Sequence, residues 1–273
     1  MTGAILGDIA GSRFEFNNRK SKEFELFTHR CTFTDDSVMT IAVVEAFIRY
    51  NGLTEAERKV DSEKGYAELK RILVDSMHRI GRRYPDCGYG GRFYYWIMEN
   101  RTEPYKSYGN GSAMRVSPVI WYANSLEEAE ALAKATAEVT HNHTEGIKGA
   151  QAVAGAGYLA KTGASIEEIR KYVSKYYTID FTLDEIRNGY SFYETCQDSV
   201  PQALEAFFES TGFEDAVRNA ISIGGDSDTI GAMTGAIAEA YYGIDARLKE
   251  SAESFLTYDL LSVYEKFNEM FRK

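Results

Sequence analysis

The sequence predicts an all-α protein, folded as a single compact domain over residues 1–273. Apolar residues recur at the 3.6-residue spacing of helices in most segments. Ser or Thr followed three residues later by Glu, a pattern typical of helix N-termini, begins several of these segments. Runs that alternate apolar and polar residues are few, and no Asn-Gly dipeptide joins two of them. We therefore expect about a dozen helices and no extensive sheet.

The helical segments follow one another with short connections. Residues 64–83 place Leu69, Ile72, Leu73, Met77 and Ile80 on one face. Helical spacing also predicts helices over residues 202–209, 213–221, 246–256 and 259–271. Residues 51–63, the most charged connection, are expected to form a surface loop, and no segment has the composition of an interdomain linker.

Individual residues mark several helix starts. The pairs Ser125 and Glu128, Ser165 and Glu168, and Thr182 and Glu185 match the capping box. Proline is tolerated at the first positions of a helix, where its missing N–H costs little. Pro118 and Pro201 are accordingly expected near helix starts.

Three helical segments are unusually rich in small residues. They contain Gly3, Gly7 and Gly11; Gly146, Gly149, Ala150, Ala154 and Gly157; and Gly231, Gly235 and Ala238. Glycine in a helix costs up to about 1 kcal/mol relative to alanine, so its repeated use needs a reason. Either these helices pack closely at the centre of the domain, or a ligand or metal approaches them.

Composition restricts the possible partners and compartments. Lys and Arg number 31 against 41 Asp and Glu, so the formal net charge is −10. Nucleic acids and anionic membranes attract basic surfaces, which makes both poor candidates. The three cysteines are widely spaced, the first residues do not have the pattern of a signal peptide, and no apolar run reaches membrane-spanning length. We expect a cytoplasmic protein that acts as a monomer.

Two acidic clusters each precede a helical pattern. Residues 33–37 read Phe-Thr-Asp-Asp-Ser, and residues 223–229 read Ile-Gly-Gly-Asp-Ser-Asp-Thr. Taken separately, each cluster can be a helix cap with acidic residues in the first turn. In the second cluster, Gly224 and Gly225 would also let the backbone approach a ligand closely.

Together the two clusters predict a binuclear metal site. They are nearly 200 residues apart, and each begins a helix that is apolar enough to be buried. Buried carboxylates that face each other repel unless cations neutralise them. Oxygen ligands favour Mg²⁺, with Mn²⁺ as the alternative, over zinc. The candidate ligands are Thr34, Asp35, Asp36, Asp226, Asp228 and Thr229.

A third segment resembles an anion-binding loop. Residues 107–112 read Ser-Tyr-Gly-Asn-Gly-Ser, and a helical pattern follows from Ala113. Backbone N–H groups in such a turn can hold a diphosphate without any lysine, which suits an acidic protein. Arg115 either helps to bind the diphosphate or pairs with internal carboxylates. His141 and His143 form an H-x-H pair, but no third nitrogen or sulfur ligand is nearby to complete a zinc site.

Five motifs together resemble the ADP-ribosylglycohydrolase family. They are GDIAGSRFE at 7–15, FTDDS at 33–37, SYGNGSAMR at 107–115, THNH at 140–143 and SIGGDSDTIGAMTGAIAEAYYG at 222–243. The resemblance implies an all-α fold around two Mg²⁺ ions. It also implies hydrolysis of the C1″ glycosidic bond of an ADP-ribosylated protein or small ADP-ribose conjugate, with release of ADP-ribose.

The resemblance also implies roles for single residues. Glu15, Asp35 and Asp36 would be catalytic, with Glu15 orienting water or the scissile ribose, and either Glu15 or a metal-bound aspartate accepting the proton. The metal ligands would be the six residues of the two clusters. ADP-ribose would contact Ser107, Tyr108, Gly109, Asn110, Gly111, Ser112, Met114, Arg115, His141, Gly224 and Gly225. His143 is expected at a helix end.

Other functions remain as alternatives. A non-catalytic ADP-ribose-binding or structural member of the family, comparable to a lens crystallin, would have lost metal ligands, whereas all six are present here. A terpenoid synthase needs D-D-x-x-D, and Met39 stands where the third Asp would follow Asp35. The linkage stays open between arginine, serine, O-acetyl and phosphate esters, although residues 107–111 resemble the loop of serine-linked and ADP-ribose-phosphate hydrolases more closely.

Overall fold

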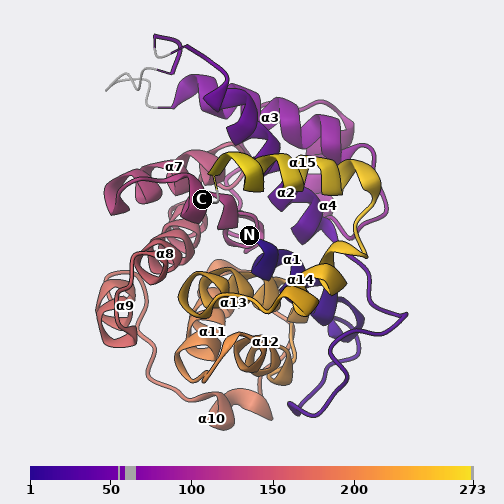
Figure 1. Ribbon diagram of the computed structural model, residues 1–273, viewed down its shortest axis with the longest axis vertical. Helices are drawn as coiled ribbons and strands as arrows, with labels where there is room; N and C mark the ends of the chain where they lie inside the picture. The colour runs from indigo at the N-terminus through magenta and orange to yellow at the C-terminus, as the bar shows by residue number, and fades with distance from the viewer. Residues whose placement is uncertain (55, 59–65, 272–273) are drawn as a thin grey trace.

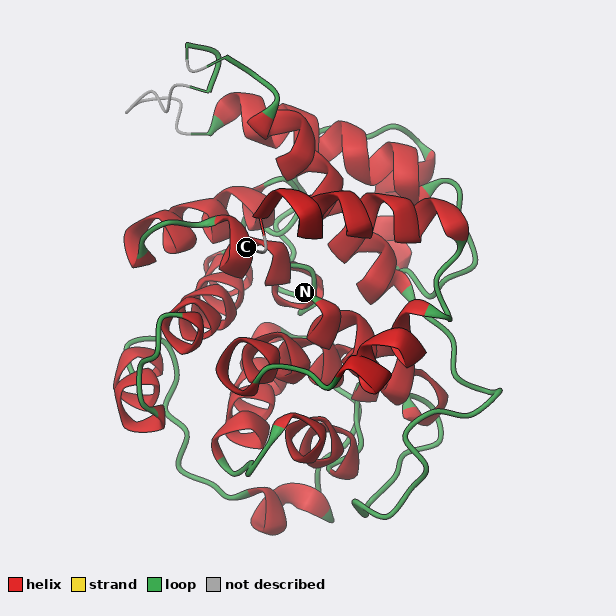
Figure 2. Cartoon of the chain, in the orientation of Figure 1, coloured by secondary structure: helices red, strands yellow, loops and turns green. Residues whose placement is uncertain are grey.

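The computed structural model describes residues 1–54, 56–58 and 66–271, and these form α-helices joined by loops, without a strand (Figure 2). This confirms the predicted all-α class. The helices are α1 (Thr2–Gly11), α2 (Asp35–Asn51), α3 (Ala67–Gly81), α4 (Gly91–Met98), α5 (Gly111–Met114), α6 (Ser117–Tyr122), α7 (Leu126–Glu138), α8 (Thr144–Lys161), α9 (Ile166–Val173), α10 (Leu183–Arg187), α11 (Cys196–Phe208), α12 (Phe213–Ser222), α13 (Ser227–Tyr242), α14 (Ala246–Glu253) and α15 (Tyr258–Phe271). A 3₁₀ turn, η1, follows α1 over Ser12–Phe14.

Helices α1 and α13 lie side by side in the middle of the molecule (Figure 1). All ten residues of α1 are buried, and all of them except Asp8 are small or apolar. A Cβ placed on Gly7 would lie 2.0 Å from the carbonyl oxygen of Gly231, and one on Gly3 would lie 2.1 Å from that of Gly235. The two backbones touch at these glycines. Of the two explanations for the small residues, close packing of helices therefore applies here.

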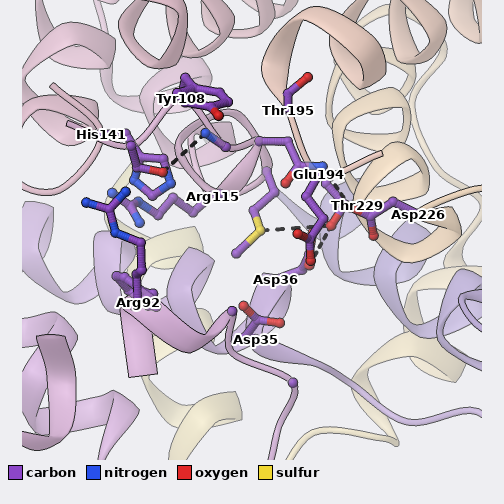
Figure 3. Close-up of a pocket in the computed structure, with 18 of the residues that line it drawn as sticks. Asp35, Asp36, Arg92, Tyr108, Arg115, His141, Glu194, Thr195, Asp226 and Thr229 are labelled. Carbon is purple, nitrogen blue, oxygen red and sulfur yellow. Dashed lines mark hydrogen bonds between the residues drawn. The ribbon is translucent and has the colours of Figure 1, made fainter. Parts of the chain in front are cut away.

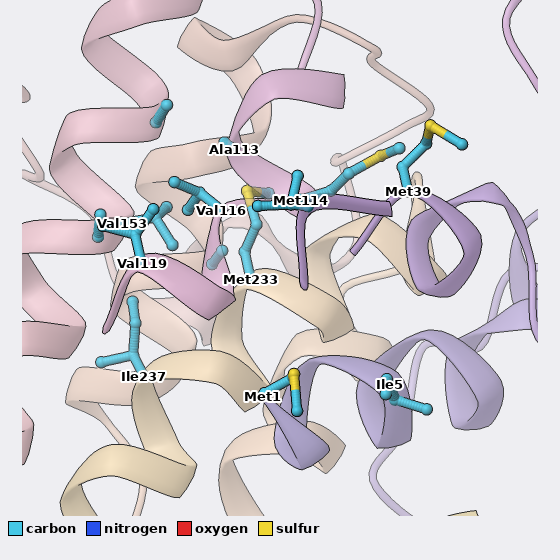
Figure 4. Close-up of a cluster of buried hydrophobic side chains, with 14 of the residues drawn as sticks. Met1, Ile5, Met39, Ala113, Met114, Val116, Val119, Val153, Met233 and Ile237 are labelled. Carbon is cyan, nitrogen blue, oxygen red and sulfur yellow. The ribbon is translucent and has the colours of Figure 1, made fainter. Parts of the chain in front are cut away.

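Small residues in α8 serve the same purpose. A Cβ on Gly149 would lie 2.5 Å from the Cys196 sulfur of α11, and one on Gly157 would lie 2.2 Å from Ile120 of α6. Around these contacts, apolar side chains from several helices form one core, in which Ile5, Met39, Val153 and Met233 represent α1, α2, α8 and α13 (Figure 4). None of the helices in the described ranges is long and apolar enough to cross a membrane.

The predicted caps are largely present. Thr34, Ser125, Ser165 and Thr182 each accept a hydrogen bond from a backbone N–H in the first turn of α2, α7, α9 and α10. The capping box is complete at Ser165 and Thr182. At Ser125 it is not, because the Glu128 carboxylate accepts from the backbone N–H of Asn124 instead, at 2.8 Å.

One helix start differs from the prediction. Pro118 lies at the beginning of α6, as expected, but Pro201 lies inside α11, which begins at Cys196 rather than at residue 202. Thr195 caps this helix, and the Ser199 hydroxyl donates to the Thr195 carbonyl at 2.7 Å. With the cap in place and the apolar residues around Pro201 buried, one missing backbone hydrogen bond is tolerated.

The remaining boundaries agree to within a few residues. The predicted segments 213–221, 246–256 and 259–271 correspond to α12, α14 and α15, and 64–83 corresponds to α3. Residues 55 and 59–65, which include residues 55 and 59–63 of the expected surface loop, lie outside the described residues. Three short helices of four to six residues, α5, α6 and α10, were not separable by periodicity.

The contact between α1 and α13 gives a stability prediction. Gly7→Ala places a methyl group against the backbone of Gly231, which no side-chain rotation can relieve. We expect the free energy of unfolding to fall by about 3 kcal/mol, the upper range for overpacked cores, in urea denaturation followed by circular dichroism. Gly212→Ala is the matched control, because a Cβ there has no atom within 4 Å. Equal denaturation midpoints for the two variants would contradict the backbone-contact explanation.

Candidate active site and metal centre

A cavity of about 370 Å³ opens where the N-terminal ends of α2 and α13 face α5 and two loops (Figure 3). This volume is in the range of small-molecule sites. The cavity is lined by Glu15, Asp35, Asp36, Gly88, Gly90, Gly91, Arg92, Phe93, Tyr105, Ser107, Tyr108, Gly109, Asn110, Gly111, Met114, Arg115, His141, Phe192, Glu194, Thr195, Asp226, Asp228 and Thr229.

The two acidic clusters meet at one end of this cavity. Asp35 and Asp36 are the first residues of α2, and Asp226 and Asp228 flank the start of α13. The clusters touch directly, because the Thr229 hydroxyl donates to Asp36 Oδ2 at 3.1 Å across 193 residues of chain. The structure thus brings together the side chains that the sequence predicts as ligands, since packing of α13 on α1 and of α1 on α2 aligns their ends.

Asp8 belongs to the same cluster, a role that the sequence reasoning missed. It is fully buried in α1, where its carboxylate accepts hydrogen bonds from the Thr34 and Ser37 backbone N–H groups at 3.0 and 3.1 Å and from both hydroxyls. The Thr34 side chain therefore points to Asp8 and does not line the cavity. The sequence feature that could have identified Asp8 is its position as a lone aspartate in an otherwise apolar, glycine-rich helix.

These carboxylates form two groups that can hold metal ions. Oxygen atoms of Asp8, Asp36 and Asp228 lie within 4.8 Å of one another, and so do those of Glu15, Asp226 and Asp228. Asp228 is common to both groups. Asp36 Oδ1 and Asp228 Oδ1 are buried without a hydrogen-bond partner. Buried oxygen atoms that lack donors fit a hard cation, which takes oxygen ligands.

Burial and mutual repulsion shift the protonation of the whole cluster. Burial is the largest cause for each group, and it raises the pKa of Asp8 to about 6 and that of Asp226 to about 7. For Asp35 and Asp36, burial raises the pKa well above its usual value, and the charge of Asp228 raises it further. In the absence of cations, the site therefore retains protons at neutral pH.

Glu15 extends the cluster from the loop after η1. It is half-buried, and burial followed by the charges of Asp228 and Asp8 raises its pKa to about 8. Asn18 holds this loop: its amide group donates to the Glu15 carbonyl at 2.8 Å and to the Gly225 carbonyl at 3.1 Å, and its oxygen accepts from the Gly225 N–H at 2.8 Å. The Glu15 loop and the turn before Asp226 are thus one connected unit.

Gly224 and Gly225 lie in this turn and not in the cavity lining. Both have positive φ, 71° and 75°, a conformation that side chains disfavour. A Cβ on Gly225 would also lie 2.5 Å from the Tyr190 ring. In the structure the two glycines allow the turn that aims Asp226, and they do not present their backbone to the cavity.

The opposite end of the cavity is formed by residues 107–111. A backbone bridge joins this loop to residues 194–196, through the Asn110 N–H to the Glu194 carbonyl and the Cys196 N–H to the Tyr108 carbonyl. The Asn110 amide nitrogen donates to Asp226 Oδ2 at 2.7 Å, which links the loop to the acidic end. Ser112 points away from the cavity and donates to the Gly146 carbonyl at 2.7 Å. The expected helix after this loop is the short α5, and Met114 at its end lines the cavity.

Arg115 and His141 lie behind the loop (Figure 3). Arg115 is fully buried and donates to the Thr136 carbonyl and the Thr140 hydroxyl, at 3.1 and 2.7 Å, so its hydrogen-bond partners are neutral groups. The Thr140 hydroxyl also bonds His141 Nδ1 at 2.7 Å. Burial, and then the charge of Arg115, lowers the pKa of His141 well below its usual value, so this imidazole is neutral at pH 7. His143 caps α8, as expected of a helix-end residue.

Several lining residues carry no sequence signal. Arg92 and Phe93 come from the start of α4, Tyr105 from the following loop, and Phe192, Glu194 and Thr195 from the loop before α11. Arg92 lies over the Tyr105 ring, 4.7 Å from its centroid. In a chain with 19 Tyr and 15 Phe, one ring is not distinguishable from another by pattern. Only the packing of distant segments places these side chains at the cavity.

The raised pKa values predict how pH and cations act on stability. Native carboxyl groups with pKa values of about 6 to 8 bind more protons than the unfolded chain does between pH about 4 and 8. The free energy of unfolding of the metal-free protein should therefore fall as pH rises through this interval. A divalent cation relieves the repulsion once the groups ionise. We expect Mg²⁺ to raise the Tm of EDTA-treated protein more at pH about 8 than at pH about 5, by calorimetry.

Asp228→Asn is the informative variant for this measurement. It removes the carboxylate common to both groups while conserving its shape. Without metal, the variant should be more stable than the parent chain at pH about 8, and most of the Mg²⁺-dependent rise in Tm should disappear. A Mg²⁺ effect that is equal at both pH values, or unchanged in Asp228→Asn, would contradict a cation site at these residues.

Comparison with known proteins places the chain among enzymes. Residues 1–253 match the ADP-ribosylglycohydrolase family model. The chain is 30% identical over 267 residues to ADP-ribosyl-[dinitrogen reductase] glycohydrolase of Rhodospirillum rubrum, covering 89% of this chain and 84% of that protein. It is 27% identical over 358 residues to ADP-ribosylhydrolase ARH3 of Mus musculus, covering 98% and 91%.

Two further similarities agree with this placement. ADP-ribosylarginine hydrolase Tri1 of Pseudomonas putida is 25% identical over 280 residues, covering 93% of this chain and 72% of that protein. A solved structure of an ADP-ribosylglycohydrolase-related protein complex shares the fold, with a TM-score of 0.65 at 23% identity over 96% of this chain and 94% of that one. A family match over most of its length therefore shows that this chain belongs to the ADP-ribosylglycohydrolase family and is a hydrolase.

Proposed function

We propose that the protein hydrolyses the C1″ glycosidic bond of ADP-ribosylated substrates and releases ADP-ribose, with two Mg²⁺ ions, or Mn²⁺, in the acidic end of the cavity. The observation that carries this proposal is the pair of carboxylate groups that share Asp228 and contain unpartnered buried oxygens. The relatives are named for the hydrolysis of ADP-ribosyl groups.

Residues from two helix starts would hold the cations. Asp35 and Asp36 of α2, together with Asp226 directly before α13 and Asp228 and Thr229 in its first turn, present oxygen atoms at the cavity. Thr34 is the sixth candidate ligand, although its hydroxyl donates to Asp8 at 2.7 Å in the structure. Asp8 would support them as a positioning residue, since its carboxylate accepts hydrogen bonds from the backbone N–H groups of Thr34 and Ser37, on either side of Asp35 and Asp36. When bound, the cations supply Lewis-acid stabilisation and orientation of ribose hydroxyls.

In the reaction, the C1″–N or C1″–O bond breaks, water adds its oxygen to C1″, and a water proton passes to the leaving atom. Such cleavage proceeds through an oxocarbenium-like state. We assign the proton transfer to Glu15, because its carboxyl group reaches the cavity from a separate loop and burial raises its pKa to about 8. One of the aspartates that would hold the cations is the alternative proton acceptor.

The nucleotide part would lie at the opposite end. Among the described residues, the backbone N–H groups of Gly111 and Ser112 have no hydrogen-bond acceptor, so both can donate to the diphosphate. The buried charge of Arg115 lies next to this loop, and no carboxylate among the described residues forms an ion pair with it, which favours an anion nearby. Tyr108 is half exposed at the mouth and can stack on the adenine.

The physiological partner would be an ADP-ribosylated protein or a small ADP-ribose conjugate. Nucleic acids and membranes are disfavoured by the net charge of −10. We also propose a monomer of the cytoplasm, where Cys31, Cys87 and Cys196 would remain reduced, as they are free in the structure. The relatives' names include both an ADP-ribosylarginine hydrolase and a dinitrogen-reductase glycohydrolase. Which linkage this protein cleaves is therefore determined by the substrate panel below.

The function is tested with a panel of arginine-linked, serine-linked, O-acetyl and 1″-phosphate derivatives of ADP-ribose, with and without EDTA. We expect release of free ADP-ribose from at least one substrate and its loss in EDTA. Glu15→Gln should retain ADP-ribose binding while its kcat falls at least about 10²-fold, the scale of a positioned acid or base. Near-normal kcat in this variant would remove Glu15 from the mechanism, and no release from any substrate would contradict the proposed function.

The position of the diphosphate gives a separate prediction. A Cβ on Gly111 would lie 3.0 Å from His141 Nε2, at the loop whose N–H groups we assign to the phosphates. Gly111→Val should raise the Kd for ADP-ribose about tenfold or more, equivalent to roughly 1.4 kcal/mol. Mg²⁺ affinity should be unchanged, because no carboxylate is altered. Titration calorimetry measures both, and wild-type affinity for ADP-ribose in a folded variant would place the diphosphate elsewhere.

A further inference from the structure

Exposed aromatic side chains gather around the mouth of the cavity. In the described part of the chain, eight large hydrophobic side chains are exposed. Two of them, Tyr108 and Phe192, line the cavity, and three more, Phe16, Tyr94 and Tyr193, directly adjoin a lining residue in the sequence. Single exposed aromatics need no explanation, but several at one site are typical of a binding surface. Tyr108 lies at the nucleotide end (Figure 3), whereas Phe16 follows Glu15, and Phe192 and Tyr193 precede Glu194.

Phe16 and Phe192 form a stacked pair beside the acidic end. Their ring centroids are 5.8 Å apart with an interplanar angle of 27°. Phe16 nevertheless keeps 85% of its surface exposed, so the pair contributes little burial to folding. A phenylalanine this exposed, directly after the candidate catalytic Glu15, is better explained by a partner that covers it.

The two loops that carry this pair are held in place. Asn18 attaches the Glu15 loop to both backbone polar groups of Gly225. The Lys20 ammonium group donates to the Tyr190 carbonyl at 2.6 Å and to the Ile223 carbonyl at 2.5 Å, which ties the same loop to the one that precedes Phe192. A preorganised aromatic surface loses little conformational entropy when a partner binds.

The location of the pair identifies which part of a substrate would meet it. In the proposed function the nucleotide occupies the end with residues 107–111, and the ribose lies at the carboxylates. The group attached to C1″ then leaves on the side of Glu15, where Phe16 and Phe192 stand. A phosphate or acetyl leaving group is small and polar, so it has too little apolar surface to pack against a phenyl ring. A polypeptide offers side chains on either side of the modified residue.

We propose that Phe16 and Phe192 form a contact surface for the polypeptide that carries the ADP-ribose. The substrate class is therefore an ADP-ribosylated protein segment with an apolar or aromatic residue beside the modified side chain. This inference rests on the proposed function and adds the recognition of the protein part. Aromatic residues dominate such contacts because they bury a large area at a small entropic cost.

The test compares three substrates that share the linkage cleaved in the panel. They are an ADP-ribosylated peptide with Leu or Phe next to the modified residue, the same peptide with Ser there, and the ADP-ribosylated amino acid alone. Phe16→Ser should lower kcat/KM for the apolar peptide about tenfold and leave the amino acid unaffected. Phe16→Leu should restore most of the activity. Tyr258→Ser is the matched control, since Tyr258 is 86% exposed on α15 and does not line the cavity.

The outcomes separate the two proposals. Selective loss on the apolar peptide supports the contact surface. Equal rates of Phe16→Ser and the parent enzyme on all three substrates, or an equal loss on all three, would overturn it while leaving the hydrolase function intact. If the parent enzyme cleaves none of them and none of the panel, the proposed function fails, and the inference about its protein substrate fails with it.

Discussion

Direct contact between the backbones of α1 and α13 is the constraint on which the site depends. Gly3 and Gly7 oppose Gly235 and Gly231 so closely that no Cβ fits between the helices. This brings Asp8, in the middle of α1, next to the first turn of α13, where Asp228 lies. Any larger residue at the contact would separate the helix axes and the carboxylates with them. The glycines therefore lower the helix propensity of both segments, but they set the distance between the carboxylates of Asp8 and Asp228.

The protein holds this charge cluster at an electrostatic cost. Burial and mutual repulsion raise the pKa of Asp36 and Asp228 well above the ordinary value, and one oxygen of each has no donor. The acidic residues are nonetheless held by neutral donors such as Thr34, Ser37 and Asn110. An arrangement that is unfavourable alone and rigidly supported is typical of a preorganised site.

The cavity is chemically divided between its two ends. One end offers carboxylates, and the other offers backbone N–H groups with the buried guanidinium of Arg115 and the neutral imidazole of His141. Asn110 connects the ends through its hydrogen bond to Asp226. A molecule with an anionic diphosphate and a hydroxyl-bearing sugar matches this order of groups. The stacked rings of Phe16 and Phe192 adjoin the acidic end, where the proposed contact surface would meet the group attached to the sugar.

The sequence by itself determined the all-α class, most helix boundaries, and the acidic clusters around Asp36 and Asp228, because caps, periodicity and carboxylate spacing are local properties. It misplaced the start of α11 because Pro201 reads as a helix start, while tertiary burial keeps it inside the helix. Only the tertiary structure decided that Asp8 joins the cluster and that Phe192 reaches Phe16. Those contacts join segments far apart in the chain, and no local pattern encodes which distant side chains share a cavity.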